Sequence, residues 1–201
     1  MVAKKLVSLF PKKGRVLTQC FGETIVGCMG REIKNQNKDI EFFCPETRPY
    51  LQGARLTASV LKEQGFKTTV ITDNMVAWTI LQKKIDLFTS AADTICMDGN
   101  IVNKVGTLQI AILCKHFGIP YFVTGIPDAD KLKKDIVIEE RNPNEVLEFN
   151  GLKNTLDGVE AYYPAFDITP PYLVNGVVTD KKIFSPYNLD EYYKGDVEQY
   201  Y

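Results

Sequence analysis

Between residues 15 and 126 the sequence alternates between strand-like and helix-like segments, and this alternation limits the chain to few folds. The helix-like segments space their apolar residues at helical intervals, and one of them ends on Gly65, a typical stop signal. Strands joined by single helices predict an α/β, Rossmann-like fold, in which a mostly parallel sheet carries helices on both faces. The expected strands are 15–20, 39–46, 66–73, 85–93 and 119–126, and the expected helices are 22–36, 50–65, 74–84 and 103–118.

Beyond residue 126 the alternation becomes looser. The sequence there offers a short strand, an Asn-Pro-led turn of helix, a Pro-started helical turn and a last strand. The tail at 187–201 is polar, acidic and rich in tyrosine, and it is either an arm that docks on a partner subunit or a poorly ordered end. The sequence contains neither an internal repeat nor a linker, so we expect a single Rossmann-like domain over 1–201 with a lead-in at 1–14.

Composition excludes several classes of protein. The net charge of -1 and the pI of about 5.9 argue against a nucleic-acid surface, which needs a basic stripe. No run of about 18 apolar residues predicts a membrane span, and the apolar stretch near the start is too short and interrupted for a secretion signal. The cysteines are odd in number and form no CxxC motif, which favours reduced thiols in a cytoplasmic protein. They are Cys20, Cys28, Cys44, Cys96 and Cys114.

The chain has one histidine, His116, so it lacks the residues for a histidine-based zinc site or a Ser-His-Asp triad, and we expect no metal. His116 closes the helix-like run LQIAILCKHFG, and we expect it near the C-terminus of that helix.

Polar residues gather where the predicted strands end. Cys20 ends the first strand, the loop 45–53 with Gln52 follows the second, Asp73 follows the third, and Asp93 follows the fourth. Since ligands bind at the carboxyl ends of strands in open parallel sheets, these residues predict a site at one edge of the sheet.

Two of these residues can carry chemistry. Cys20 stands just before a predicted helix N-terminus, where the helix dipole favours a thiolate, although a buried cysteine ending a strand is the commoner case. Asp93 follows an apolar strand, and half-burial would raise its pKa and allow it to act as an acid. The alternative is a carboxylate that only caps a helix or turn.

Asn103 and Lys104 open the predicted helix at 103–118, where free backbone N–H groups beside an ammonium suit a phosphate. Asparagine is also a common helix N-cap, so this signal is weak by itself. The nearby glycines match neither GxGxxG nor GxxxxGK[ST], so the sequence contains no motif for a dinucleotide or for ATP.

Four longer segments resemble a known family. They are ETRPYLQGARLTA, VITDNM, AADTICMDGNIVNKVGTLQIAILCKHFGIPYFV and PAFDITPPYLVNGVVTD. Together they resemble the methylthioribose-1-phosphate isomerase family, which is related to the alpha, beta and delta subunits of translation initiation factor 2B and to ribose-1,5-bisphosphate isomerase. The resemblance covers residues 15–186 in the same order.

The resemblance implies an aldose–ketose isomerase that needs no cofactor and acts on a pentose 1-phosphate, with 5-methylthioribose 1-phosphate as the favoured substrate. Cys20 and Asp93 match the catalytic pair of the family, and Gln52, Asn103 and Lys104 match its substrate-binding residues. The resemblance also implies a homodimer.

Within the loop 45–53 and just after it, we expect Gln52 to point at the ligand. Arg48 and Arg55 would instead hold the loop through Glu46 or backbone carbonyls.

The sequence also departs from the family pattern. Family enzymes carry an N-terminal helical domain with arginine-containing substrate contacts, whereas this chain begins almost at the first predicted strand. The cysteine motif reads QCFGE, and Ala91 replaces the glycine of the family's G-A-D motif. Two hypotheses follow: an isomerase, acting with a separately encoded N-terminal-domain chain if one is needed, or a non-catalytic regulatory or assembly module that senses a sugar phosphate.

Overall fold

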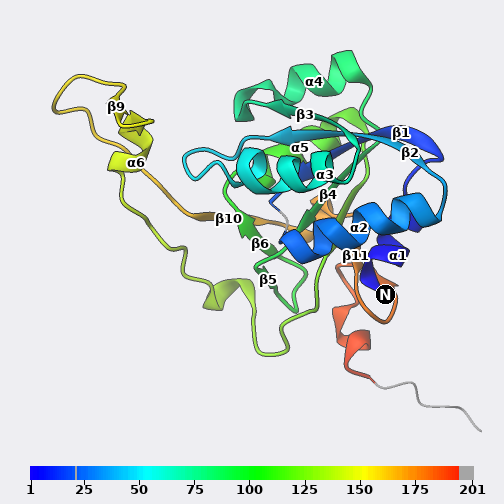
Figure 1. The fold of residues 1–201 in the computed structure, drawn as a ribbon. Coiled ribbons are helices and arrows are strands. Elements are labelled where there is room, and N and C mark those ends of the chain that lie inside the picture. Colours follow the sequence, from blue (N-terminus) through cyan, green and yellow to red (C-terminus); the bar gives the residue numbers. More distant parts are fainter. Residues whose placement is uncertain (21, 195–201) are drawn as a thin grey trace, which may run out of the picture.

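The computed structural model describes residues 1–20 and 22–194 and is built around one large sheet (Figure 1). Its strand order is β12-β11-β7-β4-β1-β2-β3, and all neighbours are parallel except β12, which runs antiparallel to β11 at one edge. The Rossmann-like, mostly parallel α/β fold predicted from the sequence is therefore confirmed. The strands are β1 Lys13–Gln19, β2 Asp39–Pro45, β3 Lys67–Ile71, β4 Leu87–Ala91, β7 Tyr121–Thr124, β11 Gly176–Val178 and β12 Ile183–Phe184.

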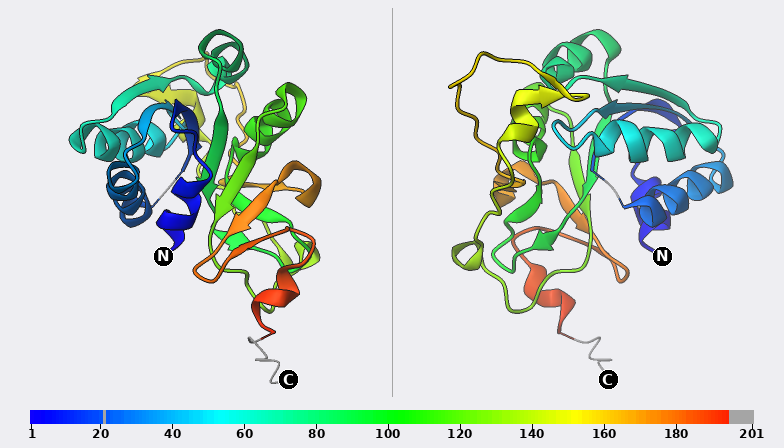
Figure 2. Two further views of the ribbon diagram at one scale, coloured as in Figure 1. Left: turned by 90° about the vertical axis from the view of Figure 1, so that its right-hand side faces the viewer. Right: turned by 60° about the vertical axis from the view of Figure 1, so that its left-hand side comes forward.

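Helices cover both faces of this sheet, as the two views in Figure 2 show. One face packs against α1, α2 and α3, and the other packs against α4 and α5. The helices are α1 Val2–Ser8, α2 Glu23–Asn35, α3 Ser59–Glu63, α4 Val76–Lys83, α5 Thr107–Phe117 and α6 Asn144–Leu147. Single helical turns are η2 Asp73–Met75, η3 Lys133–Asp135, η4 Pro171–Leu173 and η5 Leu189–Tyr192.

Neighbouring residues in each central strand serve opposite faces. In β2, Phe42 belongs to the core under α1, α2 and α3, whereas Phe43 belongs to the core under α4 and α5. Val16 and Leu17 divide in the same way in β1, and all four side chains are buried. This two-residue period is what a strand covered on both faces requires, and it explains why these strands read as continuous apolar runs.

The lead-in predicted at 1–14 contains a helix that the sequence analysis missed. In and just after α1, Leu6, Val7 and Phe10 are buried against the core under α2. Each such side chain stabilises the fold by about 1.5–3 kcal/mol relative to an exposed one. The short helix is therefore held by its contacts with the rest of the chain, since seven residues are too few to form a stable helix alone.

A second, smaller sheet follows β4. It has the order β10-β6-β5, with β5 Thr94–Ile95, β6 Ile101–Lys104 and β10 Phe166–Thr169 in antiparallel pairs. The sequence analysis expected Asn103 and Lys104 to open a helix, and this was wrong, because both residues end β6 and α5 begins only at Thr107. His116 lies in the last turn of α5, as expected.

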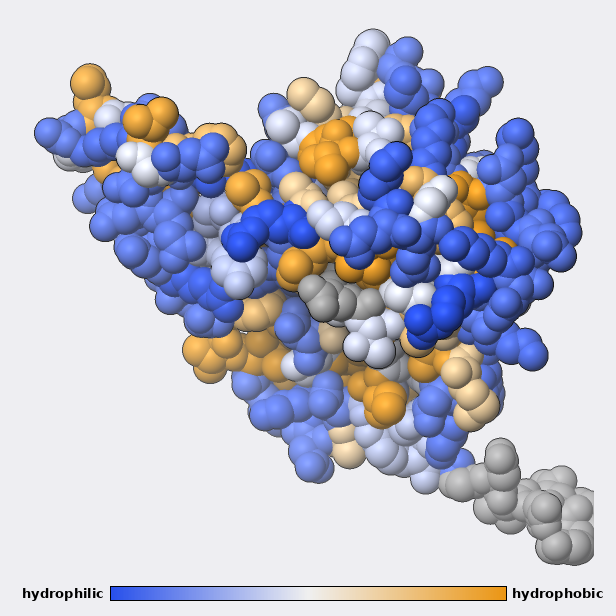
Figure 3. Space-filling model, viewed as in Figure 1, coloured by the Kyte–Doolittle hydropathy of each residue, from blue (hydrophilic) through white to orange (hydrophobic). Residues whose placement is uncertain are grey.

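Residues 126–165 form a long arm that projects from the body (Figure 1). The arm includes η3, α6 and a hairpin of β8 Glu148–Phe149 and β9 Leu152–Lys153. Figure 3 shows apolar surface on it. Leu152 and Leu156 of the arm are 72% and 83% exposed. The predicted Asn-Pro-led turn is α6, and the predicted Pro-started turn is η4.

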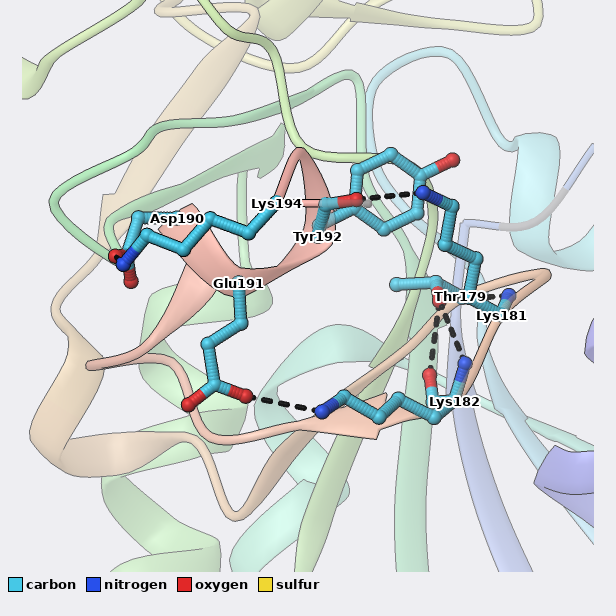
Figure 4. A network of polar contacts seen from close by, with 7 residues as sticks. All are labelled: Thr179, Lys181, Lys182, Asp190, Glu191, Tyr192 and Lys194. Atoms are coloured by element: carbon cyan, nitrogen blue, oxygen red, sulfur yellow. Dashed lines mark hydrogen bonds and ion pairs between the residues drawn. The ribbon is translucent and has the colours of Figure 1, made fainter. Parts of the chain in front are cut away.

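The first part of the tail, residues 187–194, packs on its own chain. Leu189 and Tyr192 of η5 are buried. Figure 4 shows the polar contacts that fasten this segment: Lys181 Nζ donates to the carbonyl of Tyr192 (2.7 Å), and Lys182 Nζ pairs with Glu191 (2.9 Å). The remaining residues of the predicted tail, 195–201, lie outside the described residues.

Within residues 1–20 and 22–194, none of the helices is long and apolar enough to cross a membrane.

Candidate active site

The strand order reverses direction next to β1. From β1 the chain adds β2 and β3 on one side, then returns to place β4 and β7 on the other. In an open α/β sheet the crevice at such a switch point, beyond the carboxyl ends of the two strands, is where ligands bind. Cys20 directly follows β1 and Asp93 follows β4, so the two predicted catalytic residues lie on either side of this crevice.

Cys20 has an unusual backbone conformation, with φ at 39° in the left-handed region that non-glycine residues seldom adopt. Its half-buried thiol accepts a hydrogen bond from the side-chain amide of Gln52. Burial and the charge of Asp93 raise the pKa of this thiol to about 11, although Lys104 and Gln52 act in the opposite direction. Of the two alternatives for Cys20, the raised pKa favours the buried, protonated thiol over the thiolate.

Gln52 reaches the thiol because its loop is fixed from two sides. The backbone N–H groups of Thr47 and Arg48 donate to the carboxylate of Asp73 at 2.9 and 2.7 Å, which ties the loop after β2 to the end of β3. These are charge-assisted hydrogen bonds to a carboxylate, the stronger kind. Asp73, which the sequence analysis placed at this edge, is thus a structural support of the loop.

Gly53 fixes the other side of the loop. A Cβ atom on Gly53 would lie 1.9 Å from the carbonyl oxygen of Pro45, so only glycine allows the backbone to pass this close to the end of β2. Gly53 begins a π-helical turn, η1 Gly53–Ala58, which continues into α3. Turns of this kind are frequent at functional sites.

Asp93 lies at the mouth of the crevice. Its backbone N–H donates to the carbonyl of Val102 in β6 (2.9 Å), and the residue is accessible to solvent. The surrounding chain nevertheless removes enough water to raise the pKa of Asp93, while the charges of Lys104 and Arg141 lower it. A carboxyl group that is both accessible and harder to ionise suits a proton donor.

Asn103 and Lys104 lie next to this carboxylate on the end of β6. Asn103 is buried and donates from its amide to Thr107 Oγ1 (3.0 Å). Lys104 is 4% exposed, and its ammonium lies over the ring of Phe166, 4.1 Å from the centroid. Burial and the charge of Arg141 lower the pKa of Lys104, and Cys20 and Asp93 raise it. Among the described residues Lys104 forms no ion pair, which leaves a buried cation facing the crevice.

Asp167 is a residue of this region that the sequence analysis missed. Its carboxylate accepts hydrogen bonds from the backbone N–H groups of Gly106 (2.7 Å) and Leu108 (3.1 Å) at the start of α5. The N–H groups that were expected to bind a phosphate are thus occupied by a carboxylate of the protein itself. Burial raises the pKa of Asp167 to about 6, although the two hydrogen bonds lower it. The motif PAFDITPP contained this aspartate, but no local pattern links it to a helix almost 60 residues earlier.

Arg48 fixes the loop that carries Gln52, but only one of its two expected kinds of partner is observed. Its guanidinium donates to the carbonyls of Glu145 (3.3 Å) and Glu148 (3.1 Å), and so joins the loop that carries Gln52 to the arm. The backbone-carbonyl part of the expectation is confirmed, whereas Glu46 is not the partner. Arg55 is exposed on η1.

A family model described as the initiation factor 2 subunit family matches residues 1–186. The methylthioribose-1-phosphate isomerase of Bacillus pumilus is 39% identical, over 94% of this chain and 57% of the relative. The enzyme of that name from Petrotoga mobilis is 42% identical, over 86% of this chain and 50% of the relative. The chain thus spans about half the length of these relatives.

Solved structures of related proteins also superpose on this chain. The 5-methylthioribose 1-phosphate isomerase of Pyrococcus horikoshii superposes with a TM-score of 0.87 at 34% identity, over 96% of this chain and 58% of the other. The delta subunit of translation initiation factor eIF-2B from A. fulgidus superposes with a TM-score of 0.84 at 31% identity, over 92% and 57% of the two chains.

Proposed function

Because this chain belongs to the initiation factor 2 subunit family, and because its crevice brings together Cys20 and Asp93, we propose that it is a sugar-phosphate isomerase. The proposed substrate is 5-methylthioribose 1-phosphate, and the product is 5-methylthioribulose 1-phosphate, an aldose–ketose isomerisation in methionine salvage. The relatives from Bacillus pumilus and Petrotoga mobilis carry the name of this enzyme. The reaction is an internal redox exchange between C1 and C2, so it needs no external oxidant or reductant and, in our proposal, no cofactor.

Asp93 would start the reaction as general acid. The phosphate on C1 keeps the sugar in its ring form, and the ring opens when its oxygen receives a proton. The raised pKa of Asp93 supports this role, because burial makes the proton available nearer to neutral pH than on an ordinary aspartate.

Hydrogen must then move from C2 to C1. One route is abstraction of the C2 proton by a base, and the other is direct transfer of a hydride to the electron-poor C1, with loss of the proton from the C2 hydroxyl. A thiol with a pKa of about 11 is protonated and is a weak base near neutral pH, which favours the hydride route. On that route Cys20 acts as a neutral hydrogen-bonding group beside the reacting carbons.

Gln52, Asn103 and Lys104 would position the substrate. Lys104 supplies positive charge for the phosphate, and its lack of an ionic partner among the described residues supports that use. Gln52 holds the thiol and has a carbonyl oxygen that can accept a hydrogen bond from a sugar hydroxyl.

A homodimer is part of the proposal. Trp78 and Leu81 of α4 and Ile112 of α5 are 66%, 52% and 50% exposed, on two helices that contact each other. An apolar surface of this kind is typical of an interface. We also propose that a further polypeptide segment, on the same or a separate chain, closes the site over the exposed Asp93.

The test is turnover of 5-methylthioribose 1-phosphate by this chain, with ribose 1-phosphate as a second substrate. Cys20→Ala should lose activity, and Cys28→Ala, at a half-buried cysteine on α2, is the matched control that should keep it. A Cys20→Ala protein as active as the Cys28→Ala protein would contradict the assignment.

A second function is supported by the A. fulgidus subunit, whose fold matches nearly as well as that of the isomerase. On that view the chain is a regulatory or assembly module that binds a sugar phosphate without turning it over. Binding of 5-methylthioribose 1-phosphate with no turnover, alone or with a partner chain, would favour the module.

A further inference from the structure

A second cation lies close to Lys104, on a segment that the sequence analysis did not connect with the site. Arg141 belongs to the arm, and the residues around it pair with the segment just before β10. The N–H of Arg141 donates to the carbonyl of Tyr163 (2.9 Å), and the N–H of Ala165 donates to the carbonyl of Glu139 (2.8 Å). Residues 139–141 therefore have a fixed position beside residues 163–165.

This pairing brings Arg141 to the aromatic ring that carries Lys104. Phe166 pairs with Lys104 across β10 and β6, and its ring centroid lies 4.1 Å from Lys104 Nζ and 5.9 Å from Arg141 Cζ. The charge of Arg141 acts on both neighbours in the crevice. After burial, which is the larger effect on each group, Arg141 lowers the pKa of Lys104 and, together with Lys104, that of Asp93.

The two cations differ in how they are compensated. Arg141 is 31% exposed and forms a two-pronged ion pair with Glu139, at 2.9 and 3.2 Å. Glu139 is 54% exposed, so water can take the place of either partner at little cost. Lys104 is almost fully buried and has no carboxylate partner within residues 1–20 and 22–194. A buried cation without a counter-ion is costly, and an anion bound between Lys104 and Arg141 would remove that cost.

We propose that Arg141 is a further substrate-binding residue, which holds the phosphate of the sugar phosphate together with Lys104. Glu139 keeps the guanidinium oriented until the phosphate replaces it as the partner. A guanidinium binds phosphate through two parallel hydrogen bonds, a geometry that an ammonium cannot provide. The identity of the ligand rests on the proposed function, whereas the added residue lies outside the motifs that suggested that function.

The arm is tied to the rest of the site at a second point. Arg48 joins it to the loop that carries Gln52, through the carbonyls of Glu145 and Glu148. Arg141 and Gln52 are thus held by one connected set of contacts between the arm and the loop after β2.

The experiment measures binding of inorganic phosphate by calorimetry at constant ionic strength, followed by turnover of 5-methylthioribose 1-phosphate. Arg141→Gln should weaken phosphate binding about ten-fold or more, and Arg141→Lys should recover part of the loss. Glu139→Gln separates binding from support of the arm: it removes the ion pair but leaves the guanidinium free, so phosphate should bind at least as tightly as in the wild type. Arg31→Gln, an exposed arginine on α2, is the control for loss of one charge.

Equal weakening in Arg141→Gln and Glu139→Gln would overturn the proposal, because it would mean that the ion pair only supports the arm. Unchanged phosphate binding in Arg141→Gln, or no phosphate binding by the wild type, would overturn it as well. Thermal unfolding of each variant identifies any that fails to fold. If phosphate binding depends on Arg141 but the wild type does not turn over the sugar phosphate, the proposed function fails and the assignment of Arg141 stands.

Discussion

The two edges of the large sheet that are formed by the N-terminal and the C-terminal ends of its strands are both polar. Their charges are arranged in opposite ways. At the N-terminal edge of the strands, a hollow of about 790 Å³ is lined in part by charged residues that pair with one another. Glu41 binds both Arg15 (3.1 Å) and Lys67 (3.0 Å). At the C-terminal edge, the side chains of Asp93 and Lys104 form no ion pair among the described residues.

This difference makes the N-terminal hollow the poorer candidate for a ligand site. Charges that neutralise one another at the surface hold strand ends together and have little to offer a ligand. Charges that burial has perturbed and that no partner compensates gain the most from a ligand, and such groups cluster at functional sites.

The largest expected effect of any substitution is at Asp93. Asp93→Asn should lower kcat/KM for 5-methylthioribose 1-phosphate by about 10²–10⁴-fold, the usual contribution of a general acid. In the wild type, kcat/KM should fall as the pH rises through the raised pKa of Asp93, because the acid works only while protonated. The variant should lose this dependence. Full activity in Asp93→Asn would remove the acid from the proposed mechanism and leave the two edges functionally alike.

A smaller but still large effect is expected at Gly53, which shapes the C-terminal edge. Gly53→Ala should destabilise the protein by about 1–3 kcal/mol in urea unfolding, because the added Cβ meets the backbone of β2. The control is Gly27→Ala on α2, where the nearest atoms lie 3.8 and 3.9 Å from the added carbon. That substitution should be neutral or stabilising by less than about 1 kcal/mol. Similar stability in both variants would show that the loop is not held against β2.

The sequence predicted the parts of the fold that depend on local pattern. The five parallel strands between residues 13 and 124 lie within a few residues of their expected positions, because each is a short apolar run between turn signals. The placement of Cys20, Gln52 and Asp93 after the ends of parallel strands follows from the same reasoning, since a parallel sheet places such residues at one edge. The assignment of residues 1–201 to one domain stays a prediction.

The errors came from contacts between distant residues. Asn103 and Lys104 belong to a strand because β6 pairs with β10, more than 60 residues later, and no local pattern reports such a pairing. The choice between thiol and thiolate for Cys20 stayed open, because it depends on burial, which is a property of the whole fold. Arg141 was missed because only the pairing of residues 139–141 with 163–165 brings it to Phe166.

A further prediction concerns Asp167, which lies beside the site and has a pKa of about 6. Between its unfolded value near 3.8 and this folded value, the folded state binds more protons than the unfolded state. Stability should therefore fall as the pH rises through this window, by about 1–2 kcal/mol after allowance for partial solvation. Asp167→Asn should remove this fall, as measured by urea unfolding between pH 4 and about 7. An identical pH dependence in the variant would assign the fall to other carboxyl groups.

The smallest effect is expected at Glu41, on the opposite edge, and its sign is reversed. Burial alone would raise the pKa of Glu41, but the hydrogen bonds and charges of Lys67 and Arg15 lower it overall. Its contribution to stability is thus present at neutral pH and lost as the pH falls through the folded pKa. Glu41→Gln should cost less than about 1 kcal/mol at neutral pH, and the cost should shrink in high salt and disappear in acid.

Isomerase activity should not change in Glu41→Gln. Lys13→Gln breaks an ion pair whose side chains are 83% and 74% exposed. It should therefore have no measurable effect on stability. Loss of turnover in Glu41→Gln with stability intact would mean that the N-terminal edge also serves the reaction. Charges that already form ion pairs would then also act on a ligand. The lack of an ion-pair partner would no longer indicate where the site lies.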